Sequence, residues 1–222
     1  MADIQAIETI WAGDRFRSRL EARWAVFFNA AGIRYIYEPE GFYKICCPGD
    51  NRDPGDKYLP DFYLPEYDIY AEVKGERPGI GEEVKKAVNI MANKFNRKVL
   101  LILPEIPNAG ALNCGVWWLP IYYYHPLCGI TGCRAAFLSR LTDKGKQIRL
   151  TTNFAVGCHC YLNTFRPEWI EKETKAIADK DMPRNNEFPV REEFDDFYLI
   201  DCFVKARQAR FEHGESPEVI NW

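Results

Sequence analysis

Residues 58–74 read Tyr-Leu-Pro-Asp-Phe-Tyr-Leu-Pro-Glu-Tyr-Asp-Ile-Tyr-Ala-Glu-Val-Lys, and this stretch decides the fold. The runs Tyr58–Leu64 and Tyr67–Lys74 are rich in aromatic and β-branched residues, which predicts two strands. Pro65 and Glu66 lie between them and mark a turn. The stretch therefore predicts a hairpin-like return of the chain.

Successive side chains of a strand point to opposite faces of its sheet. In the second predicted strand, Glu72 and Lys74 share one face with Tyr70. The alternate residues, which can enter the core, are Ile69, Ala71 and Val73. The return of the chain at the turn is expected to bring Asp61 beside Glu72.

Two neighbouring carboxylates repel each other, so a pair formed by Asp61 and Glu72 needs a compensating charge. Mg²⁺ takes oxygen ligands and is usually held by one or two protein carboxylates together with water and phosphate oxygens. Such an ion polarises a phosphoryl oxygen and activates bound water. Lys74 is placed to orient that water, or help deprotonate it, and to offset charge on the phosphate. Two carboxylates and a lysine in this arrangement match the residues needed for metal-dependent phosphodiester hydrolysis.

The flanking sequence predicts a small α/β layer around this hairpin. Apolar residues recur at helical spacing over residues 14–31, and Ser18-x-x-Glu21 is a capping box that would start the helix at Ser18. Gly32 follows as the expected C′ residue. Downstream, a helical pattern over residues 82–95 leads to an apolar run at 99–103. A strand, helix, strand order at this spacing indicates a parallel crossover.

These motifs together resemble the PD-(D/E)XK nuclease superfamily. Pro60-Asp61, ten intervening residues and Glu72-Val73-Lys74 match its signature, and Glu21 lies on an early helix as in that family. The resemblance covers roughly residues 14–104. It implies an α/β fold with a restriction-endonuclease-like αβββαβ core, which cleaves nucleic acid with Mg²⁺ or Mn²⁺.

The resemblance also implies a role for each matching residue. Asp61 and Glu72 would be metal ligands, with the Val73 carbonyl as a third. Lys74 would be the catalytic lysine, and Glu21 an accessory ligand, directly or through water. Other interpretations stay open: Glu72 and Lys74 as a surface ion pair, Glu21 as a capping residue only, and Asp61 as a turn residue.

Charge is unevenly distributed along the 222 residues, whose formal net charge is −3. Residues 1–80 carry a net −4, residues 81–165 a net +6 and residues 166–222 a net −5. The near-neutral total speaks against a uniformly basic nucleic-acid binder, but the basic middle allows an anionic partner. We divide the chain into a nuclease-like core over 1–110, an aromatic, cysteine-rich and basic region over 111–165, and a C-terminal helical extension over 166–222.

The middle region contains two close cysteine pairs. Cys128 and Cys133 form one, and Cys158 and Cys160, which flank His159, form the other. Two such pairs brought together can hold a structural Zn²⁺ with four thiolates, or with His125 or His159 in place of one. The alternative is four buried free thiols.

The insert between the cysteine pairs is basic and predicts a β-hairpin or loop that contacts phosphates. Its candidate nucleic-acid-binding residues are Arg134, Arg140, Lys144, Lys146 and Arg149. A solvated loop without a ligand is the alternative. The aromatic run of Tyr122, Tyr123 and Tyr124 could stack on bases, or else belong to the core.

Residues 166–180 and 190–211 are predicted helices. The amphipathic face of the second would dock on the core or on a protein partner, and its acidity argues against contact with DNA. That face comprises Phe194, Phe197, Tyr198, Asp201, Cys202 and Lys205.

The predicted function is therefore a metal-dependent DNA nuclease. The alternative is a non-catalytic DNA-binding or protein-assembly module on a nuclease-like scaffold. Cleavage of both strands would favour a homodimer or two encounters with the substrate. The first residues lack the basic and apolar regions of a signal peptide, and no apolar run is long enough to span a bilayer, so we expect a cytoplasmic protein without a membrane partner.

Overall fold

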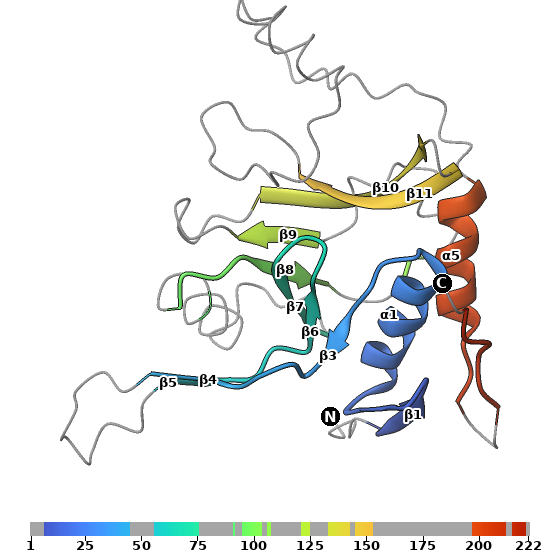
Figure 1. Cartoon of the computed structure of the whole chain (residues 1–222). Helices are drawn as coiled ribbons and strands as arrows, with labels where there is room; N and C mark the ends of the chain where they lie inside the picture. The colour runs from blue at the N-terminus through green and yellow to red at the C-terminus, as the bar shows by residue number, and fades with distance from the viewer. Residues whose placement is uncertain are drawn as a thin grey trace, which may run out of the picture.

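The computed structural model describes residues 7–44, 56–75, 91, 95–103, 106–107, 121–124, 133–142, 145–152, 197–211 and 215–220. This part of the chain has a mixed α/β fold built on a seven-stranded sheet (Figure 1). From one edge to the other, the strands are β11 (Gly145–Thr152), β10 (Cys133–Thr142), β9 (Ile121–Tyr124), β8 (Val99–Ile102), β7 (Ile69–Val73), β6 (Phe62–Leu64) and β3 (Ile36–Tyr37).

The hairpin and the parallel crossover predicted around residues 58–103 are confirmed. β6 and β7 pair antiparallel, with Phe62 opposite Ala71. β7 and β8 pair parallel, with Tyr70 beside Val99. Both faces of β7 are covered, which is why all five of its residues are buried.

The helix predicted over residues 14–31 is shorter than expected. α1 spans Arg19–Ala30, and Asp14–Phe16 instead forms β2, antiparallel to β1 (Thr9–Trp11). Phe16 is fully buried as a strand residue. Because Phe16 is apolar and lies at helical spacing from Leu20, the sequence pattern predicts a helix that starts too early.

The two cap residues predicted for this helix, Ser18 and Gly32, are confirmed. Ser18 has extended backbone angles (φ −142°, ψ 155°) and is the N-cap, and its hydroxyl oxygen accepts the Glu21 N–H at 3.2 Å. At the other end, Gly32 has φ +67°, the left-handed conformation typical of a C′ residue.

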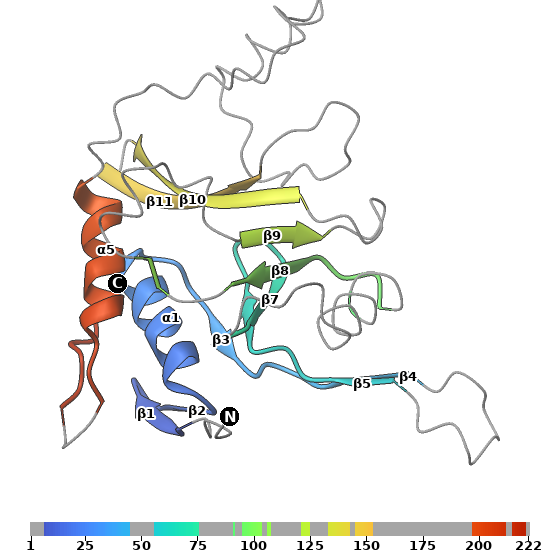
Figure 2. The same ribbon diagram turned by 180° about the vertical axis from the view of Figure 1, so that it is seen from behind.

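α1 and α5 (Phe197–Gln208) lie side by side on one face of the sheet (Figures 1 and 2). Their shared core is aromatic: Phe27 stacks on Phe203 with ring centroids 4.3 Å apart, and Phe137 of β10 lies 5.0 Å from Phe27. The sequence predicts that the last helix docks on the core or on a protein partner, and its docking on the core is confirmed.

The face of α5 that docks matches the predicted one only in part, at Cys202 and Tyr198. The buried residues of α5 are Leu199, Cys202, Phe203 and Ala206. Phe197, assigned to the docking face, is 73% exposed. Because α1 takes the neighbouring position, the helix turns Phe203 rather than Phe197 inward.

The other face of the sheet carries a second apolar cluster. Tyr70, Val99 and Leu101 form it together with Met91, which is fully buried. The helix predicted over residues 82–95 lies outside the described residues except for Met91 and Phe95, both of which belong to this cluster. Tyr122 and Tyr124 also pack against it, which favours their core interpretation.

The first strand predicted in residues 58–74 is interrupted. Tyr58 ends β5 (Asp56–Tyr58), which pairs with β4 (Phe42–Lys44) in a two-stranded arm that extends away from the sheet (Figure 2). β6 starts only at Phe62. Pro60 lies in the break, and proline cannot donate a ladder hydrogen bond.

The basic insert contains the predicted β-hairpin. β10 and β11 pair antiparallel, from Ala135 opposite Thr152 to Thr142 opposite Gly145. β9 pairs with both β8 and β10. One sheet therefore contains strands from both sides of residue 110, the boundary predicted between the nuclease-like core and the cysteine-rich region. Within the described residues, no helix is sufficiently long and apolar to span a membrane.

Candidate active site

The β6–β7 hairpin brings Asp61 and Glu72 together, as the sequence predicts. Asp61 directly precedes β6, and the Val73 N–H donates to its Oδ2 at 2.7 Å. Asp61 is 3% exposed and Glu72 is 4% exposed. Two buried carboxylates on adjacent strands are costly unless a cation or several donors compensate them. This cost marks the pair as a candidate functional site.

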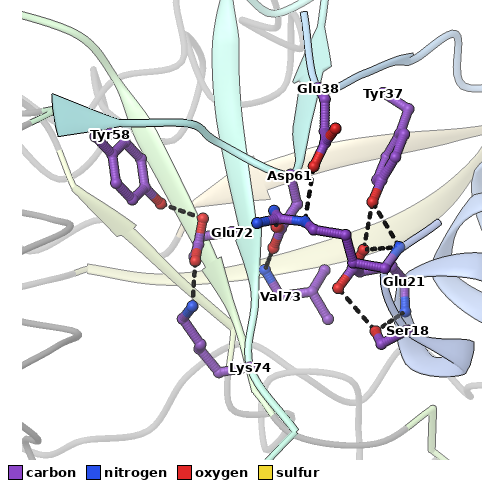
Figure 3. A network of polar contacts seen from close by, with 10 residues as sticks. Ser18, Glu21, Tyr37, Glu38, Tyr58, Asp61, Glu72, Val73 and Lys74 are labelled. Atoms are coloured by element: carbon purple, nitrogen blue, oxygen red, sulfur yellow. Dashed lines mark hydrogen bonds and ion pairs between the residues drawn. The ribbon is translucent and has the colours of Figure 1, made fainter. Parts of the chain in front are cut away.

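Glu72 lies between Tyr58 and Lys74 (Figure 3). The Tyr58 hydroxyl donates to Oε2, and the Lys74 ammonium pairs with Oε1. The ion pair of the alternative interpretation is present, but the Glu72 side chain is only 5% exposed, so the pair does not lie on an exposed surface. Sequence reasoning missed Tyr58, because the residue belongs to the arm rather than to the predicted strand.

Arg17 is the cation paired with Asp61. Its Nη2 lies 2.6 Å from Asp61 Oδ1, and its Nε lies 2.7 Å from Glu38 Oε1. The side chain is half-exposed, whereas Asp61 is buried. Sequence reasoning missed Arg17 as well; the available signal was a basic residue directly before the Ser18 cap.

Glu21 takes part in the capping network (Figure 3). Its Oε1 accepts the Ser18 hydroxyl at 2.8 Å. Its Oε2 accepts the Tyr37 hydroxyl at 2.6 Å and the Arg17 backbone N–H at 3.1 Å. The capping interpretation is therefore confirmed, and three of the roughly four lone-pair sites of this carboxylate are occupied. The role of accessory ligand stays a prediction.

Burial and nearby negative charges raise the pKa values of both Asp61 and Tyr58. Burial, followed by the charges of Glu72 and Glu21, raises the pKa of Asp61 to about 8, against the Val73 N–H and Lys74, which lower it. Burial, then the charge of Glu72, raises the pKa of Tyr58 well above its ordinary value, so its hydroxyl keeps its proton.

Lys74 is a stable cation in this arrangement. Burial opposes its charge, but Glu72 outweighs that effect, and the pKa of Lys74 rises above its ordinary value. The ammonium is therefore protonated at neutral pH. It is suited to hold Glu72 and to offset charge on a phosphate, rather than to accept a proton from water.

The stability of the metal-free protein should fall as pH rises. The unfolded Asp61 carboxyl loses its proton near pH 3.8, whereas the folded one keeps it until about pH 8. The unfolded state therefore binds fewer protons in this window, and unfolding becomes easier by up to about 1.4 kcal/mol per pH unit. Urea unfolding in EDTA between pH 5 and 8 measures this slope, and Asp61→Asn should flatten it. An unchanged slope in the variant would contradict the assignment to Asp61.

The donor chemistry at this pair fits Mg²⁺ or Mn²⁺. Asp61 and Glu72 provide two carboxylates, and Mg²⁺ commonly uses only one or two of these. Among the described residues, no three His, Cys, Asp or Glu side chains converge on one metal position. A metal held here would thus complete its shell with backbone oxygen, such as the predicted Val73 carbonyl, and with water or substrate oxygens.

The predicted zinc and phosphate residues are only partly described. Cys133 begins β10 opposite Tyr123, while Cys128, Cys158 and Cys160 lie outside the described residues. Cys202 is buried, and its Sγ donates to the Ala30 carbonyl at 3.3 Å.

Arg149 is the predicted phosphate contact whose surroundings are best defined. Its Nη1 lies 3.1 Å from Glu66 Oε2, on the turn between β6 and β7. This ion pair ties β11 to the hairpin of the site and gives Arg149 a structural role. The remaining predicted contacts are placed by backbone only, Arg134 and Arg140 in β10 and Lys146 in β11, and Lys144 lies outside the described residues.

No protein-family model, curated protein or solved structure matches this chain.

Proposed function

We propose that this chain is a metal-dependent nuclease of the PD-(D/E)XK type that hydrolyses phosphodiester bonds of DNA. The observation that carries the proposal is the buried pair Asp61 and Glu72, with Lys74, directly after the end of β7, paired with Glu72. In the metal-free protein, Lys74 pairs with Glu72 and the half-exposed Arg17 pairs with Asp61. These partners do not fully compensate Asp61, because burial and the neighbouring carboxylates raise its pKa to about 8, and a buried carboxyl with a raised pKa is typical of a functional site.

The arrangement of elements supports the same proposal. α1 precedes the antiparallel hairpin of β6 and β7, and the parallel strand β8 follows. The order is compatible with an αβββαβ core, in which the signature residues meet at the hairpin. Asp61 enters from the start of β6, and Glu72 and Lys74 from the end of β7.

The proposed reaction assigns distinct tasks to the chain's residues. Asp61 and Glu72 would hold Mg²⁺ or Mn²⁺, which when bound polarises the phosphate and lowers the pKa of bound water. Lys74, as a protonated ammonium, would position the attacking water and offset charge on the phosphate. Tyr58 holds Glu72 from the side opposite Lys74 (Figure 3). Attack on phosphorus would release the 3′-oxygen and leave a 5′-phosphate.

A cleavage assay with the purified wild-type chain tests this function. We expect cleavage of DNA in Mg²⁺ or Mn²⁺ and none in EDTA, with Lys74→Met as the inactive control. The panel should include single-stranded, double-stranded and branched DNA and matched RNA. A preparation that leaves every substrate intact in both metals would contradict the enzymatic proposal.

One observation favours a second function, a non-catalytic DNA-binding or protein-assembly module. Both oxygens of Asp61 and of Glu72 already have protein partners, so the fold does not depend on a cation at the pair. This alternative requires DNA binding that persists in EDTA and is unchanged in Lys74→Met. A protein partner at the C-terminal region, a homodimer and a structural Zn²⁺ at the cysteine pairs also remain proposals.

A further inference from the structure

Arg17 occupies the position where a compensating cation is needed. Its Nη2 contacts Asp61 Oδ1 at 2.6 Å, and the other oxygen of Asp61 accepts the Val73 N–H. The Val73 contact comes from the backbone of a central strand and is fixed by the sheet. The contact from Arg17 comes from a long, half-exposed side chain. Of the two partners, only Arg17 can leave without disturbing the sheet.

A guanidinium and a divalent cation on the same carboxylate repel each other. At distances of a few ångströms near a protein surface, such repulsion is substantial, although solvent reduces it at a half-exposed group. We infer that Arg17 is a positioning residue that holds Asp61 in the metal-free protein and competes with the divalent cation for Asp61. This inference rests on the proposed function, because it assigns a regulator to the same metal pair.

The other contacts of Arg17 allow such an exchange. Its Nε lies 2.7 Å from Glu38 Oε1, so the side chain keeps an acidic partner after it leaves Asp61. Its backbone N–H donates to Glu21 and to the Tyr37 hydroxyl, and its side chain also interacts with Tyr37. Replacement of the side chain removes the positive charge from Asp61 and keeps the backbone contacts to the capping network of α1.

Binding of Mn²⁺ without nucleic acid tests the inference, with free Mn²⁺ measured by electron paramagnetic resonance at pH 7.5. We expect Arg17→Ala to bind Mn²⁺ about tenfold more tightly than wild type. Arg17→Met, which keeps the aliphatic stem, should show the same gain in affinity. It replaces Arg17→Ala in the comparison if alanine at this position impairs folding. Arg17→Lys keeps the charge and should stay near the wild-type affinity.

Arg15 provides the matched control. It lies two residues earlier, carries the same charge and pairs with Glu8 instead of a site residue. Arg15→Ala should leave Mn²⁺ affinity unchanged, which separates local competition from a general change in net charge. Equal or weaker binding by both Arg17→Ala and Arg17→Met would overturn the inference while the metal site stands. A wild-type chain that binds no Mn²⁺ would overturn the metal site itself, and the inference with it.

Discussion

Asp61→Asn is expected to abolish metal-dependent cleavage of DNA while the protein stays folded. Asparagine keeps the shape of the side chain, and its carbonyl oxygen can still accept the Val73 N–H. It lacks the negative charge that a divalent cation needs. Loss of about 4 kcal/mol of transition-state stabilisation lowers the rate by about 1,000-fold.

Stability should move in the opposite direction from activity in this variant. The buried Asp61 carboxylate faces Glu72, which disfavours its charged form above neutral pH. In EDTA at pH 8, Asp61→Asn should therefore unfold at the same urea concentration as wild type or a higher one. Asp68→Asn, an exposed substitution in the same hairpin, serves as the control. Retention of cleavage within tenfold, or a large loss of stability, would contradict the role of Asp61.

Phe203→Ala is expected to have the largest effect on folding. The ring is fully buried and stacks on Phe27, with centroids 4.3 Å apart. Truncation of a buried phenylalanine leaves a cavity and costs about 3–5 kcal/mol. For a chain of ordinary stability, this loss removes a large fraction of the free energy of unfolding.

Phe197→Ala is the matched control on the same helix. Phe197 is 73% exposed, so its truncation should change the free energy of unfolding by no more than about 0.5 kcal/mol. Urea unfolding followed by far-UV circular dichroism compares the two variants. Equal effects of Phe203→Ala and Phe197→Ala would show that α5 does not dock on α1 through Phe203.

Local rules were sufficient to predict much of the fold around the site. Strand alternation placed Glu72 and Lys74 on one face, and the structure joins them in an ion pair. The turn after β6 placed Asp61 near Glu72, and the capping box placed the start of α1 at Ser18. Each of these features depends on residues close in sequence, where period and capping chemistry carry the information.

The missed features depend on contacts that are distant in sequence. Arg17 reaches Asp61 across 44 positions, and Tyr58 reaches Glu72 because the chain leaves the arm before β6 begins. The apolar pattern of α1 also extended into β2, because Phe16 is buried for a tertiary reason rather than a helical one. For α5, the packing of α1 determines which side is buried, and the sequence of α5 alone does not contain that choice.

A crystal structure of the wild-type chain grown with Mn²⁺, with data collected at the manganese absorption edge, tests the central claim most directly. We expect an anomalous difference peak within coordination distance of both Asp61 and Glu72, with Arg17 withdrawn from Asp61. The absence of such a peak at saturating Mn²⁺, with Arg17 still paired to Asp61, would contradict the assignment of this carboxylate pair as a metal site.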